Sequence, residues 1–411
     1  MNTLELHGRS YRLPQTPVVV ICIDGCDPEY ISDAIRRDIC PNFAYMVNHG
    51  FGAIADCVMP SFTNPNNVSI VTGAPPRMHG IAGNYFLDRT TGEEVMINDA
   101  RFLQGSTLLA GLAKAGIATA AITAKDKLTK LIGHELEGIC FSSEKAGSTS
   151  LAAYGLDSVE ALVGRPQPDM YSPDLSLYVI DAGIELLRRG LATVLYLSLS
   201  DYVQHKNAPG TEESDDFLVE IDRRLGQLIA LGATVACVAD HGMSDKTTFQ
   251  GVAQLLFVED ELNDLFGDQS ARVICPITDP FVRHHGALGS FVRVYLADQA
   301  HIAPAAAAIR AMPGVHEVML RQEAADRLSL PYEFEADLVV ISKQDWALGS
   351  SRERHDLGAV QDRPLRTHGG FSEQRVPFLI SKPLNSEGRK WAANVPLHNY
   401  DIFYAVLNFC S

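Results

Sequence analysis

The stretch SLYVIDAGIELLRRGLATVLYLSLSD, residues 176–201, contains the pattern on which the fold depends. Residues 176–190 predict a helix that ends in two arginines and a glycine, a common way for helices to end. Residues 191–200 form a continuous apolar run, as a parallel strand buried on both faces requires. An aspartate, Asp201, follows at once. The chain therefore contains a helix, then a buried strand, then a carboxylate.

The same alternation of helix and strand recurs along the chain. Residues 215–232 predict an amphipathic helix, and the apolar run 233–240 predicts a strand that again ends on aspartate. Nearer the N-terminus, residues 16–24 predict a buried strand, residues 106–116 a short helix closed by Gly116, and residues 117–123 another strand. Alternating strands and helices indicate βαβ units, so we expect an α/β fold with a mostly parallel, doubly wound sheet.

The segment 251–365 has a different pattern. Its predicted strands are 290–298, 315–320 and 336–343, and its predicted helices are 303–314 and 321–331. These elements predict a compact βαβαβ unit, which we interpret as a smaller inserted α+β domain. The main pattern resumes at THGGFSEQRVPFLIS, so residues 1–250 and 366–411 are predicted to form the larger domain.

Composition limits the classes of function. The chain has 411 residues and a net charge of −16, which argues against broad nucleic-acid binding but allows a local cationic pocket for a small anion. No apolar run approaches the ~20 residues that span a bilayer, and the N-terminus does not resemble a secretion signal. The eight cysteines are scattered without a CxxC pair. We expect a reduced, cytoplasmic enzyme without nucleic-acid or membrane partners, and a homodimer stays open.

Acidic and histidine side chains follow three predicted strands. Each could have an ordinary role, the aspartates as helix caps and the histidines as satisfied core or surface groups. Together, however, a metal centre at the carboxyl edge of the sheet explains them all. Six side chains exceed what one zinc ion needs and divide naturally into two sites. The oxygen and nitrogen donors suit two Zn²⁺ ions, without excluding Mn²⁺ or Fe²⁺. The six are Asp24, Asp201, His205, Asp240, His241 and His368.

The segment PSFTNPNNVSIVTG, residues 60–73, offers a nucleophile. Thr63 precedes Asn64, Pro65 and a helix-compatible run, so it falls about where a helix N-cap belongs. A helix N-terminus presents backbone N–H groups that suit a phosphate or phosphonate oxygen. A plain capping role is the alternative for Thr63. Ser61, Ser69 and Thr72 are weaker alternatives as nucleophile.

These motifs, together with IDG, HGIAGN, SDYVQH, ADHGM and THGG, resemble the alkaline phosphatase superfamily. The resemblance is to its threonine-nucleophile branch, which contains the nucleotide pyrophosphatase/phosphodiesterases and the phosphonoacetate hydrolases. It implies an alkaline-phosphatase-like core with a cap. It also implies that Asn84 steadies a phosphoryl oxygen. It assigns one metal ion to Asp201, His205 and His368, and the other to Asp24, Thr63, Asp240 and His241.

Within the branch, ITAKDKLTKLIG, residues 122–133, resembles the phosphonoacetate hydrolases, where lysines in such a loop bind the substrate carboxylate. Lys125 and Lys127 would take that role, although a KxK sequence is more often a solvated loop. Breaking a carbon–phosphorus bond expels electrons on carbon, and ammonium groups would stabilise the enolate-like charge that develops.

The sequence therefore predicts zinc-dependent hydrolysis of phosphonoacetate to acetate and phosphate. A nucleotide pyrophosphatase/phosphodiesterase and a non-catalytic zinc-binding protein are the alternatives. His284 and His285 could line the pocket or cap a turn.

Overall fold

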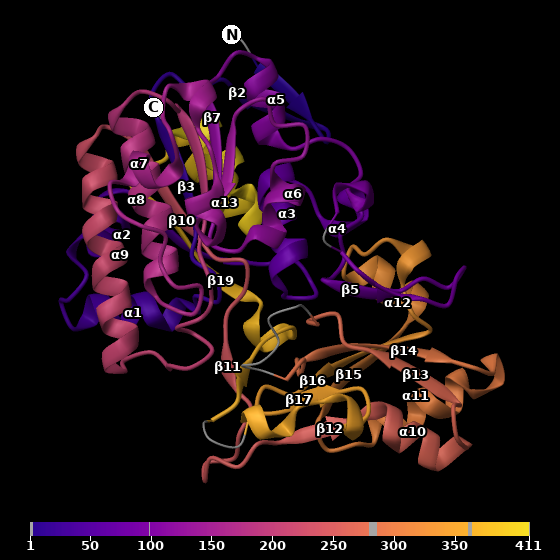
Figure 1. Ribbon diagram of the computed structural model, residues 1–411. Helices are drawn as coiled ribbons and strands as arrows, with labels where there is room; N and C mark the ends of the chain where they lie inside the picture. The colour runs from indigo at the N-terminus through magenta and orange to yellow at the C-terminus, as the bar shows by residue number, and fades with distance from the viewer. Residues whose placement is uncertain (1–2, 98, 279–285, 361–363, 411) are drawn as a thin grey trace.

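The computed structural model describes residues 3–97, 99–278, 286–360 and 364–410. Its largest sheet has seven strands in the order β4-β19-β10-β3-β9-β7-β8 (Figure 1). The five strands from β10 to β8 run parallel to one another, and β19 is antiparallel to both of its neighbours. The predicted mostly parallel α/β sheet is confirmed. The strands are β4 (Phe51–Asp56), β19 (Arg375–Ile380), β10 (Thr234–Val238), β3 (Val18–Cys22), β9 (Val194–Ser198), β7 (Thr119–Thr123) and β8 (Ile139–Ser142).

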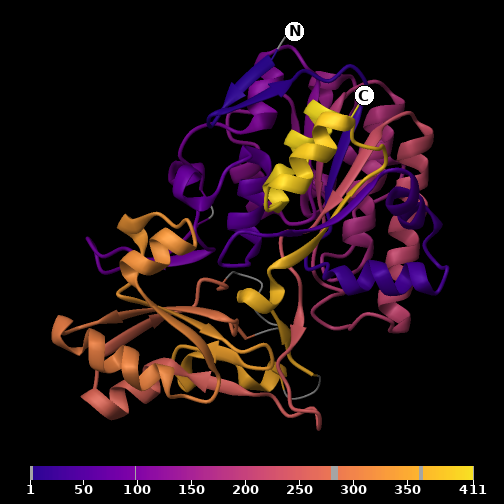
Figure 2. The same ribbon diagram turned by 180° about the vertical axis from the view of Figure 1, so that it is seen from behind.

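Helices cover both faces of this sheet (Figures 1 and 2). One layer contains α1 (Pro28–Arg36), α2 (Pro41–His49), α7 (Val159–Val163), α8 (Asp174–Arg188) and α9 (Glu212–Ala230). The other contains α3 (Thr63–Thr72), α5 (Leu108–Lys114), α6 (Thr129–Ile132), α13 (Ser386–Asn394) and α14 (Ile402–Phe409). Because both faces are covered, β3, β7, β9 and β10 are buried along their whole length. That burial explains the continuous apolar runs of the sequence.

A second, smaller unit contains a four-stranded antiparallel sheet in the order β13-β14-β16-β15 (Figure 1). The strands and helices predicted for residues 290–343 are found there, and β13 and α10 are added. Its core also includes Met59, Phe62 and Ala82 from the N-terminal part of the chain. The domain boundaries near residues 250 and 366 stay a prediction. The elements are β13 (Ala271–Ile274), β14 (Phe291–Leu296), β15 (Val315–Leu320), β16 (Leu338–Ser342), α10 (Val258–Phe266), α11 (Ile302–Arg310) and α12 (Arg321–Arg327).

A short antiparallel ribbon joins the segments that lead into and out of this unit. Ser244 of β11 (Ser244–Asp245) pairs with Thr367 of β18 (Arg366–Thr367). The ribbon therefore holds the loop that contains His241 beside the loop that contains His368.

The remaining elements are short. They are β1 (Thr3–Leu6), β2 (Arg9–Arg12), β5 (Tyr85–Leu87), β6 (Glu94–Met96), β12 (Leu255–Phe257), β17 (Ala347–Gly349) and α4 (Pro76–His79). Across the described ranges, no helix has both the length and the apolar character that crossing a membrane requires.

Candidate active site

The predicted acidic residues follow three neighbouring strands of the large sheet. Asp24 follows β3, Asp201 follows β9 and Asp240 follows β10. These strands are parallel and adjacent, so their carboxyl ends meet at one edge of the sheet. The three aspartates are 1%, 3% and 0% exposed. The fold therefore gathers three carboxylates in one buried place.

Asp24, Asp240 and His241 form a first group whose ligand atoms all lie within 4.8 Å of one another. Nε2 of His241 is 3.2 Å from Oδ1 of Asp24 and 3.8 Å from Oδ2 of Asp240. The other oxygen of Asp240 accepts hydrogen bonds from the backbone N–H groups of Gly25 and His241. Such a group could hold a metal ion.

Asp201, His241 and His368 form a second group of the same compactness. Nε2 of His205 lies 2.9 Å from Oδ2 of Asp201, and the backbone N–H of His205 donates to the carbonyl of Asp201. One helical turn thus places both side chains together, as their spacing predicts. His241 belongs to both groups, and its ring stacks on that of His368 with centroids 3.5 Å apart, so the two groups adjoin.

The three histidines share one orientation. In each, Nδ1 lies 2.8 Å from a backbone carbonyl: that of Arg366 for His205, of Gly242 for His241 and of Ser61 for His368. A carbonyl only accepts, so Nδ1 must carry the proton and donate it. Nε2 of each ring is then directed towards the site, which is the usual arrangement of metal-ligating histidine.

The electrostatics of the first group suit a cation. Neither carboxylate oxygen of the buried Asp24 accepts a hydrogen bond from the described residues. Burial and the Asp24 carboxylate raise the pKa of Asp240 to about 8. Burial alone would lower the pKa of His241, but Asp240 and Asp24 raise it to about 9. Buried carboxylates that repel one another are stabilised by a cation, so the donor set fits divalent metal ions.

Thr63 lies beside the first group. Its Oγ1 is 3.4 Å from Nε2 of His241, and it is the first residue of α3. The sequence placed it about at the N-cap, but that position belongs to Phe62, because residue 62 is extended and residue 63 is already helical. Asn84 adjoins this helix start, since its Oδ1 accepts from the backbone N–H of Asn64 at 3.3 Å.

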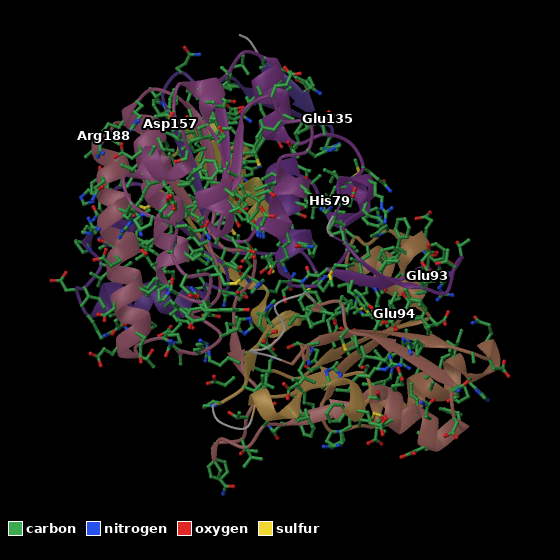
Figure 3. All side chains as sticks on the ribbon, in the orientation of Figure 1. His79, Glu93, Glu94, Glu135, Asp157 and Arg188 are labelled. Atoms are coloured by element: carbon green, nitrogen blue, oxygen red, sulfur yellow. The ribbon has the colours of Figure 1, made fainter. Side chains whose placement is uncertain are left out.

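The alternative nucleophiles have other partners. The Ser61 hydroxyl donates to the carbonyl of Gly370, and that of Thr72 donates to the carbonyl of Val68. Ser69 pairs with Nε2 of His79, the last residue of α4 (Figure 3). Among the four candidates, Thr63 is the residue whose hydroxyl has a described contact with the Asp/His groups.

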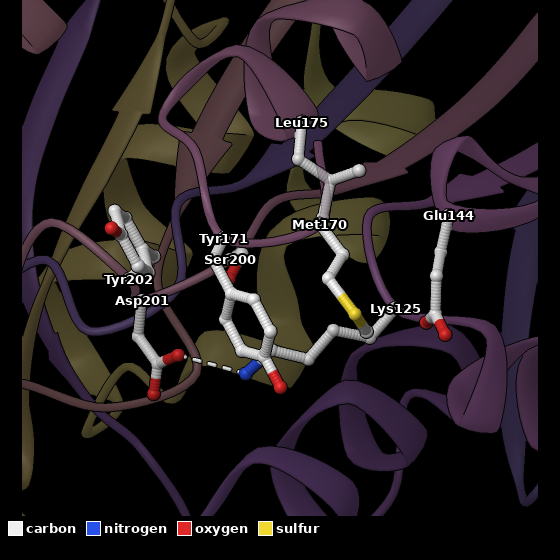
Figure 4. Close-up of a pocket in the computed structure, with 8 residues that line it drawn as sticks. All are labelled: Lys125, Glu144, Met170, Tyr171, Leu175, Ser200, Asp201 and Tyr202. Atoms are coloured by element: carbon white, nitrogen blue, oxygen red, sulfur yellow. Dashed lines mark hydrogen bonds and ion pairs between the residues drawn. The ribbon is translucent and has the colours of Figure 1, made fainter. Parts of the chain in front are cut away.

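Lys125 reaches the second group. Its Nζ donates to Oδ1 of Asp201 at 2.8 Å, and both residues line one pocket (Figure 4). Met170, Tyr171 and Tyr202 line the same pocket. Lys127 lies in the short 3₁₀ helix Asp126–Leu128 and is partly buried, and its role stays a prediction. His284 and His285 lie outside the described residues.

The sequence did not single out Asn67 or the pair formed by Lys246 and Glu373. Asn67 donates to Asp240 at 3.0 Å, and Lys246 donates to Glu373 at 2.9 Å. A four-residue spacing from Thr63 was the available signal for Asn67. For Lys246, the available signal was its position three residues after the ADHGM motif.

Comparison with known proteins places this chain in a family. The type I phosphodiesterase / nucleotide pyrophosphatase family matches residues 18–371. Phosphonoacetate hydrolase from Sinorhizobium meliloti 1021, solved in complex with phosphonoformate and with phosphonoacetate, is 43% identical. The match covers 98% of both chains with a TM-score of 0.92. Murine ectonucleotide pyrophosphatase/phosphodiesterase 5, an inactive variant with AMP, shares the fold at 15% identity, with 96% of each chain covered and a TM-score of 0.64.

Curated relatives match over shorter stretches. A phosphonoacetate hydrolase from Penicillium oxalicum is 53% identical over 38 residues, which are 9% of this chain and 53% of that sequence. An uncharacterized pyrophosphatase/phosphodiesterase of Schizosaccharomyces pombe is 35% identical over 81 residues, 20% of this chain and 16% of the relative. The chain thus spans only part of the length of these curated relatives.

Proposed function

Because the chain belongs to the phosphonoacetate hydrolases of the type I phosphodiesterase / nucleotide pyrophosphatase family, we propose that it hydrolyses phosphonoacetate to acetate and phosphate. The observation that carries the proposal is the position of Lys125, whose ammonium group contacts Asp201 of the second Asp/His group. A phosphonate that bears a carboxylate needs a cation that binds this carboxylate beside the phosphoryl site, whereas a nucleotide diester does not.

In the proposed mechanism, the Thr63 hydroxyl attacks phosphorus. The bond between Thr63 Oγ1 and phosphorus forms as the carbon–phosphorus bond breaks. The Thr63 hydroxyl releases its proton to solvent water as it attacks. The bonding electron pair passes into the carboxylate-bearing fragment, where Lys125 and Lys127 stabilise the charge until a proton returned from water completes acetate. Water then cleaves the phosphothreonine to phosphate and free Thr63. Asn84 and the N-terminus of α3 hold phosphoryl oxygens.

We propose that two divalent ions are held as the resemblance implies. One would bind Asp201, His205 and His368, and the other Asp24, Asp240, His241 and Thr63. Bound there, such ions would supply positive charge that lowers the pKa of a hydroxyl group and neutralises phosphoryl oxygens. Zn²⁺ suits the mixed oxygen and nitrogen donors, and Mn²⁺ or Fe²⁺ are the alternatives to test.

A substrate comparison tests the proposal. The protein is incubated with phosphonoacetate and, separately, with a nucleotide diester, and the released acetate, phosphate and nucleotide are measured. Acetate and phosphate in equal amounts support the proposed reaction. Release of nucleotide alone favours a phosphodiesterase, and turnover of neither substrate by protein that holds metal favours a non-catalytic metal-binding protein.

The cellular setting is also part of the proposal. We propose a reducing, cytoplasmic location, in which the eight cysteines, all within the described residues, would stay as free thiols. The net charge of −16 suits a small anionic substrate held in a local cationic pocket rather than nucleic acid. A homodimer is a further hypothesis, and light scattering of the purified protein tests it.

A further inference from the structure

Asn67 lies one helical turn after Thr63 on α3 and is completely buried. Its Nδ2 donates to the carbonyl of Thr63 and to Oδ2 of Asp240, both at 3.0 Å. Its Oδ1 accepts from the hydroxyl groups of Tyr196 and Ser198, both at 2.7 Å. One amide thus contacts the segment of the nucleophile, a metal-binding carboxylate and the strand β9.

The orientation of this amide is fixed by its partners. A backbone carbonyl and a carboxylate oxygen only accept, so they require the NH₂ end of Asn67. The hydroxyl groups of Tyr196 and Ser198 can donate, so they fit the oxygen end. The reversed amide would put oxygen against oxygen at two contacts. Asn67 can therefore satisfy all four groups in one orientation only.

Asn67 completes the support of the Asp240 carboxylate. Oδ1 of Asp240 accepts from the backbone N–H groups of Gly25 and His241 at 3.2 and 3.1 Å. Oδ2 accepts from Asn67 and also faces His241. Donors on both oxygens hold the carboxylate plane, and Tyr196 and Ser198 hold the donor itself.

We propose that Asn67 is a positioning residue that fixes the nucleophile Thr63 relative to the metal ligand Asp240. The inference rests on the proposed function, because it concerns the geometry between these two groups. Hydrogen bonds to metal-binding carboxylates orient the ligand before the ion arrives, and their loss typically weakens metal affinity or activity by about 10–100-fold. Misplacing the nucleophile should reduce kcat more than it raises KM.

The test compares Asn67→Ala and Asn67→Asp with a matched control, Asn408→Ala. The aspartate variant keeps the size of residue 67 and the oxygen that accepts from Tyr196 and Ser198, but it replaces the donor to Asp240 with a carboxylate oxygen. Asn408 is also buried and also makes two backbone hydrogen bonds, to Ser10 and Arg12, far from the site. Its variant therefore reports the cost of losing a buried asparagine anywhere in the fold.

Three quantities are measured on each variant: zinc affinity by competition with a chromophoric chelator, kcat and KM for phosphonoacetate, and the urea midpoint of the metal-free protein. Both Asn67 variants should bind the zinc ion of the group formed by Asp24, Asp240 and His241 about 10–100-fold less tightly and lose kcat by a similar factor. Asn408→Ala should lose stability while its zinc affinity and kcat stay within about two-fold of the wild type.

Unchanged zinc affinity in both Asn67 variants overturns the inference, as does an equal loss of affinity in Asn408→Ala. A wild-type protein that binds zinc without hydrolysing phosphonoacetate overturns the proposed function alone, and the affinity comparison still decides the role of Asn67. A wild-type protein that binds no divalent ion overturns both.

Discussion

Thr63 tests the proposed mechanism at the scale of a single residue. Its hydroxyl contacts His241, and the N-cap of α3 is Phe62 rather than Thr63. Thr63→Ala should therefore lower kcat by about 10³-fold or more while the protein folds and keeps much of its metal. Thr63→Ser should retain part of the activity, because it keeps the hydroxyl. Steady-state kinetics and metal analysis measure both effects. Turnover of the alanine variant at the wild-type rate would mean that water attacks phosphorus directly.

Lys125 and Lys127 decide the substrate class. If they hold the substrate carboxylate, their charge matters most as the carbon–phosphorus bond breaks. Lys125→Ala or Lys127→Ala should cost at least roughly 2–4 kcal/mol in kcat/KM for phosphonoacetate. The same variants should scarcely affect hydrolysis of an activated aryl phosphate ester, which lacks the carboxylate and has a stable leaving group.

Lys130 provides the matched control for these lysines. It is exposed on α6, close in sequence to both, so Lys130→Ala should leave kcat/KM for either substrate unchanged. Equal losses on both substrates for Lys125→Ala would assign that lysine to the phosphoryl group or to the fold. If neither variant loses kcat/KM on either substrate, the two lysines do not bind the substrate, and the phosphodiesterase alternative is favoured.

His79 makes the stability of the fold sensitive to acid. The backbone N–H of Ile81 donates to its Nδ1, so the proton lies on Nε2 and is donated to Ser69. Burial lowers the pKa of His79 to about 3. The unfolded chain, with an ordinary histidine pKa near 6.5, therefore binds a proton that the folded chain does not. The stability contribution of neutral His79 is full above pH 6.5 and is lost as the pH falls towards 3.

The expected loss is about 1.4 kcal/mol per pH unit within that range. Urea unfolding at a series of pH values should show that the free energy of unfolding falls more steeply for the wild type than for His79→Gln, by about this amount per pH unit. Identical slopes for the two proteins would show that His79 is protonated within the fold.

At the scale of elements, two properties decide whether a feature can be predicted from the sequence. They are the burial of a strand and the distance along the chain between residues in contact. The central strands β3, β9 and β10 were predictable because burial on both faces leaves a continuous apolar run. The edge strand β4 is mostly exposed or half-buried and mixes residue types. The strands β5 and β6 are three residues long and half-buried. Their sequences therefore carry little signal. The start of α3 was predictable only to within one residue: the sequence predicts Thr63 about at the N-cap, and the structure has Phe62 there.

The gathering of the Asp and His side chains was predictable because they follow strands whose ends must meet. Their supporting residues were not. Asn67 and Asp240 lie 173 residues apart, and Lys246 and Glu373 lie 127 apart. No local pattern relates such pairs, since their contact exists only after the sheet and the smaller unit have packed. Chemistry at strand ends is therefore visible in this sequence, whereas hydrogen bonds between distant elements are not.

The buried ion pair of Lys246 and Glu373 links the two loops that contain His241 and His368. Both residues are 0% exposed, and Nζ of Lys246 also donates to the carbonyl of Gln344 at 2.7 Å. The backbone of Glu373 accepts from Gly242, next to His241, and its side chain accepts from Gly370, near His368. The pair thus ties both loops together behind the site.

Replacing Lys246 with methionine should destabilise the protein by about 3–5 kcal/mol, because Glu373 keeps its charge in a buried place without a partner. The double variant Lys246→Met/Glu373→Gln should recover part of this loss, since it removes the unpaired charge. Urea unfolding of the three proteins measures the difference. A loss below about 1 kcal/mol in the single variant would show that Glu373 finds another partner.

At the scale of the whole molecule, the site depends on both units. Phe62, immediately before Thr63, packs edge-on against Phe291 of β14 and against His368, with ring centroids 6.2 and 5.6 Å away. The backbone N–H of Ser290 donates to the carbonyl of His368. The smaller unit therefore supports the start of α3 and His368 of the second Asp/His group.

The last prediction concerns the metal ions and the stability of the whole chain. The predicted ligands extend from residue 24 to residue 368, so bound ions would connect nearly all of the sequence. Ions that bind the folded state and not the unfolded chain add about 2.7 kcal/mol of stability per site when the free ion is at 100 times its Kd.

We expect near two zinc ions per chain in active protein, by elemental analysis. Chelation should abolish phosphate release and lower the thermal midpoint, and adding zinc back should restore both. The Thr63→Ala variant serves as the control, because its midpoint should still respond to zinc although it has no activity to restore. Full activity in demonstrably metal-free protein would contradict the prediction and leave the buried carboxylates to be balanced by protons alone.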